Sequence, residues 1–147
     1  VEQAILLLLD IEKTVAEGAG AATLAALLAA PERFRGKKVG LVLSGGNIDP
    51  LLLSDIIERG MVRAGRLARL RVELRDLPGA LAKVTNCLAD GGANIEEVHH
   101  QRAFTNAPVL SADVESGIQT RDREQIDDSL ERLDRAGFRA ELRNRRS

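Results

Sequence analysis

The stretch LARLRVELRDLPGALAKVTNCLADGGANI, residues Leu67–Ile95, determines the fold that we predict for this chain. Apolar and charged side chains alternate from Ala68 to Arg75, which indicates a β-strand with one buried face. The strand is expected to end at Asp76, where Pro78 presets a helical first turn.

The second half of this stretch predicts a helix and the start of another strand. Leu81, Val84 and Leu88 recur at the spacing of one helical face. Two glycines, Gly91 and Gly92, then end the helix, and Asn94 opens the next extended run. The stretch therefore predicts a strand-helix-strand unit whose helix packs on one face of a sheet.

The residues that follow complete a small domain. Val109 to Ser116 reads as a third strand, Arg121 to Ala136 as a second helix, and the run around Ala140 as a last strand. The side chains expected to face the core are Leu110, Ala112 and Val114 in the strand, Ile126, Leu130 and Leu133 in the helix, and Phe138, Ala140 and Leu142 at the end. This order, βαββαβ, predicts a ferredoxin-like sheet covered by two helices.

Composition excludes several classes of protein. The 147 residues are 44% hydrophobic, which is enough for a core, and their net charge of -1 gives no basic footprint for nucleic acid. Only the tail, with Arg143, Arg145 and Arg146, is locally basic, and we expect it to be solvated. Cys87 is the single cysteine, so an internal disulfide cannot form, and we expect a reducing, cytoplasmic setting.

The first third of the chain is apolar but too short to cross a membrane. Val1 to Val15 reads as a helix that is apolar on nearly all sides, yet its apolar core, Ile5 to Leu9, falls far below the roughly 18 residues of a span. We expect the glycines of E-G-A-G-A, residues 17–21, to break this helix, and Ala22 to Ala30 to form a second one. A chain that opens with Val1 inside such a segment looks truncated.

Residues 38–59 predict a strand, a polar loop and a helix. The continuous apolar run Lys38 to Leu43 is typical of a parallel strand buried on both faces, and Asp49 can cap a helix from Pro50 to about Arg59. Between them lies Ser44-Gly45-Gly46-Asn47. Loops at the carboxyl ends of such strands bind ligands in open α/β sheets, although the four residues taken alone are better explained as a plain turn. Gly60 and Gly65 bracket a linker, with the domain boundary near Ala64 to Leu67.

The local pattern D-L-P-G-A-L followed by G-A-N-I resembles the ACT domain, a βαββαβ module found beside enzymes of amino-acid metabolism. The resemblance spans about residues 66–143. The other interpretation is a ferredoxin-like sandwich in which the Pro-Gly pair only makes a turn.

The succession E-G-A-G-A, then G-K-K-V-G-L-V-L-S-G-G-N-I-D, then the ACT-like region, resembles the carboxyl-terminal part of a threonine ammonia-lyase, also called threonine dehydratase. The resemblance implies that residues 1–65 are the last helices and a buried strand of a catalytic domain of fold type II, which uses pyridoxal phosphate, and that residues 66–147 are a regulatory ACT domain. It also implies that Ser44, with Gly45, Gly46 and Asn47, contacts the cofactor, the serine hydroxyl bonding the pyridine nitrogen.

The same resemblance shows what this chain lacks. In the family, a lysine carries the cofactor and a glycine-rich loop holds its phosphate, and both lie upstream. None of the lysines here, Lys13, Lys37, Lys38 and Lys83, stands in the family's serine-flanked motif. We therefore expect no catalytic residue in this chain, no cofactor bound by it alone, and deamination of L-threonine to 2-oxobutanoate and ammonia only in the intact parent.

The ACT resemblance further implies an amino-acid effector bound at the corner formed by Asp76, Leu77, Pro78, Gly79 and Ala80, extended by Asn94. Unmade hydrogen bonds at the start of a helix favour a carboxylate, and Asp76 can attract an ammonium group. The purely structural interpretation is that Asp76 only caps the helix and Asn94 only shapes a turn. Because similar domains pair side by side, we expect at least a homodimer.

One further signal invites a metal interpretation. His99 and His100 follow Glu96 and Glu97, but adjacent side chains on a strand point to opposite faces and cannot readily share one ion. We expect no metal site, and one of the two histidines at an interface between domains. Two other functions stay open from the sequence: a free-standing amino-acid-binding protein of the ACT type, and a module for protein interaction.

Overall fold

The computed structural model describes residues 1–101 and 111–143 and divides the chain into two compact units, Val1–Gly60 and Met61–Ser147. Val109 and Leu110, expected in a strand, and Arg145 and Arg146, expected in a solvated tail, lie outside the described residues. In the described parts of the chain, no helix is both long enough and apolar enough to span a membrane.

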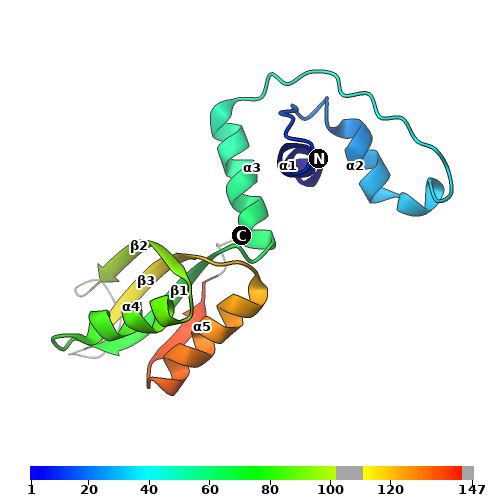
Figure 1. The fold of residues 1–147 in the computed structure, drawn as a ribbon. Coiled ribbons are helices and arrows are strands. Elements are labelled where there is room, and N and C mark those ends of the chain that lie inside the picture. Colours follow the sequence, from blue (N-terminus) through cyan, green and yellow to red (C-terminus); the bar gives the residue numbers. More distant parts are fainter. Residues whose placement is uncertain (102–110, 144–147) are drawn as a thin grey trace. The chain divides into compact units, whose positions relative to one another are not determined.

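The second unit has the predicted βαββαβ order. Its elements are β1 (Leu67–Arg75), α4 (Ala80–Asp90), β2 (Asn94–Gln101), β3 (Ser111–Gln119), α5 (Arg123–Arg135) and β4 (Arg139–Leu142). The strands form one sheet in the order β2-β3-β1-β4, and all neighbours are antiparallel. Figure 1 shows both helices on the same side of this sheet.

The core lies between the sheet and the two helices, as the alternation of side chains predicted. Every second residue of β1 faces it, so that Leu70 and Val72 are fully buried while Arg69 and Glu73 are exposed. The other buried members of this core are Ala68, Leu74, Val84, Leu88, Ala93, Ala112, Val114, Ile118, Ile126 and Leu133. Leu81, Leu130, Ala140, Leu142 and Phe138 pack against them in part, and so does Cys87.

The α5 helix starts two residues later than its pattern indicated because Asp122 caps it. The Asp122 carboxylate accepts a hydrogen bond from the Gln125 backbone N–H at 2.9 Å. Gln125, itself buried, bonds in turn to the Gly91 carbonyl oxygen at 2.8 Å through its side-chain nitrogen. The start of α5 is thereby tied to the end of α4.

The turn before α4 differs from the prediction. Pro78 does not begin the helix: Leu77 to Ala80 form a turn closed by the Ala80 N–H and the Leu77 carbonyl at 3.1 Å, and the helix starts at Ala80. Pro78 holds the second position of this turn and Gly79, with φ of 83°, the third, which is the arrangement of a type II turn. A left-handed residue cannot continue a right-handed helix, so helix and proline are separated.

The regular elements of the first unit are helices: α1 (Glu2–Asp10), α2 (Ala22–Ala29), the short 3-10 helix η1 (Pro31–Arg33) and α3 (Pro50–Arg63), whose last three residues belong to the second unit. The prediction that one helix runs to Val15 was wrong, because the chain leaves the helical conformation among the charged residues after Asp10, and Lys13 has φ of 55°. Ala4, Ile5 and Leu8 of α1 form a small core with Ala16, Ala21 and Ile56.

Asp49 caps α3 as predicted, accepting hydrogen bonds from the N–H groups of Leu51 at 2.8 Å and Leu52 at 3.2 Å. The helix nevertheless continues beyond Arg59 to Arg63. Gly60 is therefore a helical residue and not the start of a linker. Leu6 packs closely on this glycine, since a Cβ at Gly60 would stand 2.0 Å from a methyl carbon of Leu6 and would force that side chain to move.

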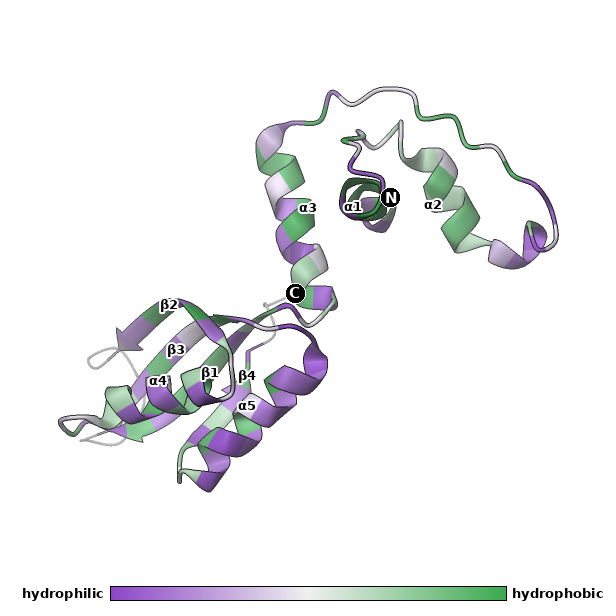
Figure 2. Cartoon of the chain, in the orientation of Figure 1, coloured by the Kyte–Doolittle hydropathy of each residue, from purple (hydrophilic) through white to green (hydrophobic). Residues whose placement is uncertain are grey.

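The predicted strand from Lys38 to Leu43 is absent. These residues have no regular secondary structure, and Val39, Leu41, Val42 and Leu43 are exposed, although Figure 2 colours much of this stretch as hydrophobic. A strand exists only beside another strand, and residues 1–60, all of which the structure describes, contain none. An apolar run without a pairing partner stays irregular.

Candidate functional site

A pocket lies at the turn between β1 and α4, where the sequence predicted the effector site. It has a volume of about 660 Å³. Its lining includes all five predicted corner residues, from Asp76 to Ala80, together with Leu74, Leu81, Ala82, Thr85 and His100. The structure therefore brings the corner residues together around one hollow.

Besides the side chains of Asp76, Thr85 and His100, the pocket has polar backbone groups at the start of α4. No side chain caps this helix. Ala80 and Lys83 use their N–H groups on the carbonyls of Leu77 and Gly79, both at 3.1 Å. The first turn of a helix carries more N–H groups than its own carbonyls can accept, and its dipole favours an anion, so this end of α4 suits a carboxylate.

A second pocket, of about 700 Å³, shares Leu74, Leu77, Pro78 and Ala80 with the first. Charged side chains line much of it: Arg71, Glu73, Arg75, Lys83, Asp113 and Arg139. Arg71 and Asp113 are joined at 2.8 Å, and Glu73 lies 4.0 Å from Arg139. We regard it as a polar surface hollow beside the turn, because both of its carboxylates, Glu73 and Asp113, are paired with arginines of the same lining.

Asn94 is not part of the pocket in the same chain. It is the first residue of β2, where its register partner is Gln119 and its amide lies 3.4 Å from the Gln119 side-chain oxygen. Gln119 pairs with Leu67 at the beginning of β1, whereas the pocket lies beyond Arg75 at the end of β1. The strand thus separates Asn94 from the other predicted site residues by the length of the sheet.

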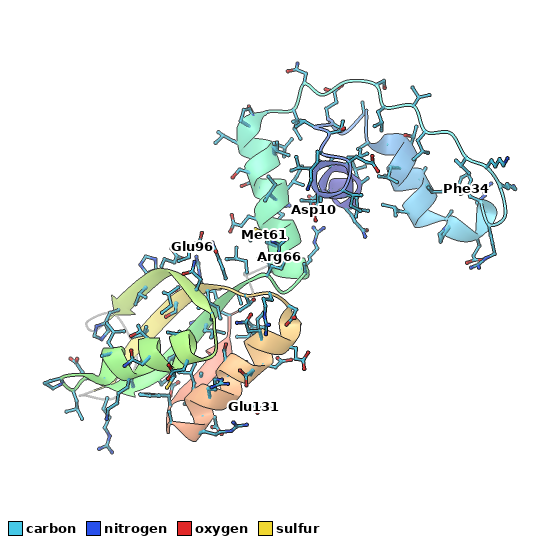
Figure 3. The ribbon with its side chains drawn as sticks, viewed as in Figure 1. Asp10, Phe34, Met61, Arg66, Glu96 and Glu131 are labelled. Atoms are coloured by element: carbon cyan, nitrogen blue, oxygen red, sulfur yellow. The ribbon has the colours of Figure 1, made fainter. Side chains whose placement is uncertain are left out.

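A bulge in β2 decides which histidine reaches the pocket. The register shifts between Ile95 and Glu97, so Glu96, labelled on β2 in Figure 3, is the extra residue. Past the bulge, Glu97 and His99 lie on the open face of the sheet, and His100 pairs with Val114 on the helix side. Gly117 leaves room for Glu97, since a Cβ there would meet the Glu97 Cγ at 2.8 Å.

His100 is the site residue that the sequence did not reveal. Its side chain lines the pocket, and its Nε2 is buried without a hydrogen-bond partner among the described residues. The doubled histidine was visible in the sequence, but its proximity to the start of α4 depends on strand pairing. No group of three or more His, Cys, Asp or Glu residues in the described parts is arranged to hold a metal ion.

Ion pairs cover the face of the sheet that carries no helix. They join Arg69 to Glu97, Arg71 to Asp113 and Glu141, Arg139 to Glu73, and Arg143 to Glu115 and Glu141. The hydrogen bonds to Asp113 and then to Glu141 raise the pKa of Arg71 above its usual value. Hydrogen bonds from His99, first, and Arg69 lower the pKa of Glu97.

The loop Ser44 to Asn47 packs against the glycine segment that precedes α2. The Glu17 N–H donates to the Gly45 carbonyl at 3.3 Å, and a Cβ on Gly20 would lie 2.5 Å from that same oxygen. The two motifs that the sequence singled out in this unit are therefore neighbours. Ser44, Gly45 and Gly46 are exposed, and the left-handed Gly45, with φ of 94°, allows the loop to turn.

Comparison with known proteins shows to which proteins this chain is related. No family model matches it. It is 42% identical over 135 residues to the L-threonine ammonia-lyase of Geobacter sulfurreducens and 39% identical over 133 residues to that of Thermotoga maritima, covering 92% and 90% of this chain. The chain is a relative of the threonine ammonia-lyases. It matches their carboxyl-terminal part and spans about a third of their length, 34% and 33% of these two relatives.

Among solved structures, the chain is similar to prephenate dehydratases from Streptococcus mutans and Staphylococcus aureus. The TM-scores are 0.44 and 0.46, at 21% and 18% sequence identity. These likenesses cover 52% and 54% of this chain and 40% and 30% of the others, and they are too distant to carry an assignment. The assignment of this chain as a relative of the threonine ammonia-lyases therefore rests on the sequence matches.

Proposed function

We propose that this chain is the regulatory portion of a threonine ammonia-lyase, in which residues 66–147 form an ACT domain that binds an amino-acid effector. The observation that carries the proposal is the match of about nine tenths of the chain to enzymes of that name. The βαββαβ order and the pocket at the turn after β1 support it. The parent would deaminate L-threonine to 2-oxobutanoate and ammonia in the cytoplasm.

The proposed effector site is the pocket between β1 and α4. The effector carboxylate would bind at the uncapped start of α4, next to Gly79, which has no Cβ to obstruct it. Asp76 supplies a negative charge for the effector ammonium. The apolar part of the lining, including Leu74 and Leu81, would accommodate the aliphatic part of the effector.

Asn94 joins this proposed site only if two copies meet. β2 is an edge strand, so one side of its backbone has no partner in the sheet. If the β2 strands of two copies pair antiparallel, the beginning of one lies beside the end of the other, and Asn94 of one copy approaches the pocket of its neighbour. The effector would then bind between two subunits and stabilise the homo-oligomer.

Residues 1–65 are, on this proposal, the end of the catalytic domain of the parent. The exposed apolar side chains of the first unit, among them Val42, Leu43 and Leu51, support it because they need further protein to cover them. Pyridoxal phosphate, when bound to the parent, supplies the electron sink for elimination from a hydroxy amino acid. Ser44 fits a contact with its ring nitrogen, since the serine is exposed and a hydroxyl can donate or accept.

Isothermal titration calorimetry tests the effector site. L-Isoleucine, L-valine, L-serine and L-threonine are titrated into the wild-type chain, into Asn94→Ala, and into Asn86→Ala, which removes an exposed asparagine of α4 away from the pocket lining. We expect at least one amino acid to bind, with an affinity that falls roughly tenfold in Asn94→Ala and stays unchanged in Asn86→Ala. Absence of heat from all four amino acids would remove the regulatory function.

A further inference from the structure

The second pocket, the hollow of about 700 Å³ beside the turn, carries two positive charges that no carboxylate of its lining offsets. Both carboxylates of the lining, Asp113 and Glu73, already lie within 4.0 Å of an arginine of the same lining. The two cations left over are Arg75 and Lys83. In the part of the chain that the structure describes, neither side chain takes part in an ion pair or a hydrogen bond.

Arg75 differs in this respect from the other arginines on the open face of the sheet. Each of the others has a carboxylate partner within the described residues: Arg69, Arg71, Arg139 and Arg143. Arg75 is the last residue of β1, and β4 begins opposite Glu73, so β4 has no residue beside Arg75. On its other side Arg75 pairs with Ser111, which is uncharged. The register of the sheet therefore leaves this guanidinium without a counter-charge.

Lys83 lines the hollow from the first turns of α4. The residues three and four positions away from it on the helix are Gly79, Ala80, Asn86 and Cys87. None of them is acidic, so α4 offers Lys83 no helical ion pair. The residues outside the described ranges cannot supply a carboxylate side chain either, because RAFTNAPVL, residues 102–110, and NRRS, residues 144–147, contain no Asp or Glu.

Two unpaired cations in one hollow favour a ligand with two negative charges. A guanidinium binds phosphate oxygens with its planar fork, and an ammonium binds them as a point charge. A phosphate monoester is close to a dianion above pH 7, since its second pKa is about 6. A free amino acid, whose two charges cancel, would leave both cations unmatched. Leu77, Pro78 and the half-buried Phe138 add apolar surface for an organic group beside the phosphate.

We propose that this hollow binds a phosphate monoester, with the phosphate between Arg75 and Lys83 and the organic group against Phe138. The site is distinct from the amino-acid site proposed above. The two pockets share part of the turn from Leu77 to Ala80, but Arg75, Lys83 and Phe138 line only this one. The proposal goes beyond the regulatory function and does not depend on it.

An NMR titration of the isotope-labelled full chain tests the site, with inorganic phosphate, phenyl phosphate and succinate added at constant ionic strength and about pH 7.5. We expect phosphate to shift the backbone amide signals of Lys83 and Phe138. Phenyl phosphate should bind at least about threefold more tightly than inorganic phosphate, because its ring adds apolar contact. Succinate, a dianion with its two charges on separate groups, should bind more weakly than phenyl phosphate.

Three variants identify the residues responsible. Arg75→Gln and Lys83→Gln should each weaken phosphate binding roughly threefold, the range expected when one exposed ion pair is lost, and the double variant should abolish it. Arg123→Gln is the matched control, because it removes an exposed cation of α5 that does not line the hollow. It should bind phosphate as the wild type does.

Several outcomes would overturn the proposal. They are the absence of phosphate-dependent shifts at Lys83 and Phe138, undiminished binding in the double variant, and a loss in Arg123→Gln as large as that in Arg75→Gln. Succinate bound as tightly as phenyl phosphate would overturn the ligand class. The amide spectrum of each variant shows whether it is folded, so weaker binding is not confused with unfolding. Amino-acid binding is measured separately by calorimetry, so failure of one site is distinguishable from failure of the other.

Discussion

At the scale of single residues, two buried hydroxyls of the second unit differ in their hydrogen bonding. The Ser116 Oγ, on the core side of β3, is fully buried without a hydrogen-bond partner among the described residues. The Thr120 Oγ1 donates to the Gly65 carbonyl at 2.6 Å. Ser116→Ala should therefore raise the free energy of unfolding by about 1 kcal/mol, whereas Thr120→Val should lower it by about 1–3 kcal/mol.

Urea denaturation followed by circular dichroism measures both changes, and each substitution is the control for the other. A loss of stability in Ser116→Ala would show that its hydroxyl has a partner, for instance in residues outside the described ranges. Equal losses in both proteins would contradict the hydrogen-bond assignment of Thr120.

The Glu97 carboxylate predicts a dependence of stability on pH. Its pKa in the folded chain is lowered from the ordinary value of 4.5, first by the hydrogen bond with His99 and then by that with Arg69. A lowered folded pKa contributes stability that is complete above the unfolded pKa and is lost as the pH falls through the folded value. Glu97→Gln should thus be less stable than wild type near pH 6, and the difference should begin to shrink near pH 4.5 and disappear only below the lowered pKa of the folded chain.

The measurement is the urea midpoint of both proteins between pH 3 and pH 7. A difference that persists unchanged to the acid end would mean that the Glu97 charge is not responsible. Because the group is on the surface, raising the salt concentration should reduce the difference at pH 6 as well.

At the scale of elements, the turn before α4 offers a test that separates backbone strain from binding. Gly79 and Gly137 have φ of 83° and 86°, and a Cβ on either would meet no heavy atom within 4 Å. Alanine at either position should cost about 1–2 kcal/mol of folding stability for the left-handed conformation alone. Only Gly79→Ala should also weaken amino-acid binding, since Gly79 lines the proposed effector pocket and Gly137 does not.

Thermal unfolding gives the two stabilities and calorimetry gives the two affinities. We expect the two variants to lose similar amounts of stability and only Gly79→Ala to bind amino acids more weakly. Binding that falls equally in both variants would assign the effect to general destabilisation instead of the turn.

Some helices and strands could be predicted from the local sequence pattern, and others could not. The alternation of Leu70 and Val72 with Arg69 and Arg71 describes a buried and a wet face within one strand, so β1 was readable from the sequence. The apolar run from Val39 to Leu43 indicates only that these side chains favour burial. Whether they form a strand depends on a neighbouring strand, which the local sequence does not reveal. The position of His100 in the pocket lining could not be predicted for the same reason. It depends on the bulge at Glu96 and on the pairing of β2 with β3.

At the scale of the whole molecule, the two units should differ in resistance to proteolysis. Lys37 and Lys38 stand at the start of an exposed stretch without regular structure, whereas Lys83 lies within α4. Cleavage requires local unfolding, which costs little in such a stretch and much in a packed helix. Trypsin, which cuts after both arginine and lysine, should therefore cut first after Arg35, Lys37 or Lys38 and leave a stable fragment that contains residues 61–143.

Mass spectrometry of the early products checks this order. A triple variant, Arg35→Gln, Lys37→Gln, Lys38→Gln, should lose these cuts without a change in the fate of the sheet unit. Early cleavage after Lys83 would contradict the compactness of the second unit.

The open face of the sheet has a consequence for how the molecule behaves as a solute. Its arginines and carboxylates alternate in sign across neighbouring strands, so the surface is zwitterionic: dense in charge yet close to neutral as a whole. Two such surfaces attract each other when few ions are present, because patches of opposite sign can align, and dissolved salt screens that attraction. The domain should accordingly be salted in, with lower turbidity in moderate sodium chloride than in dilute buffer at the same protein concentration.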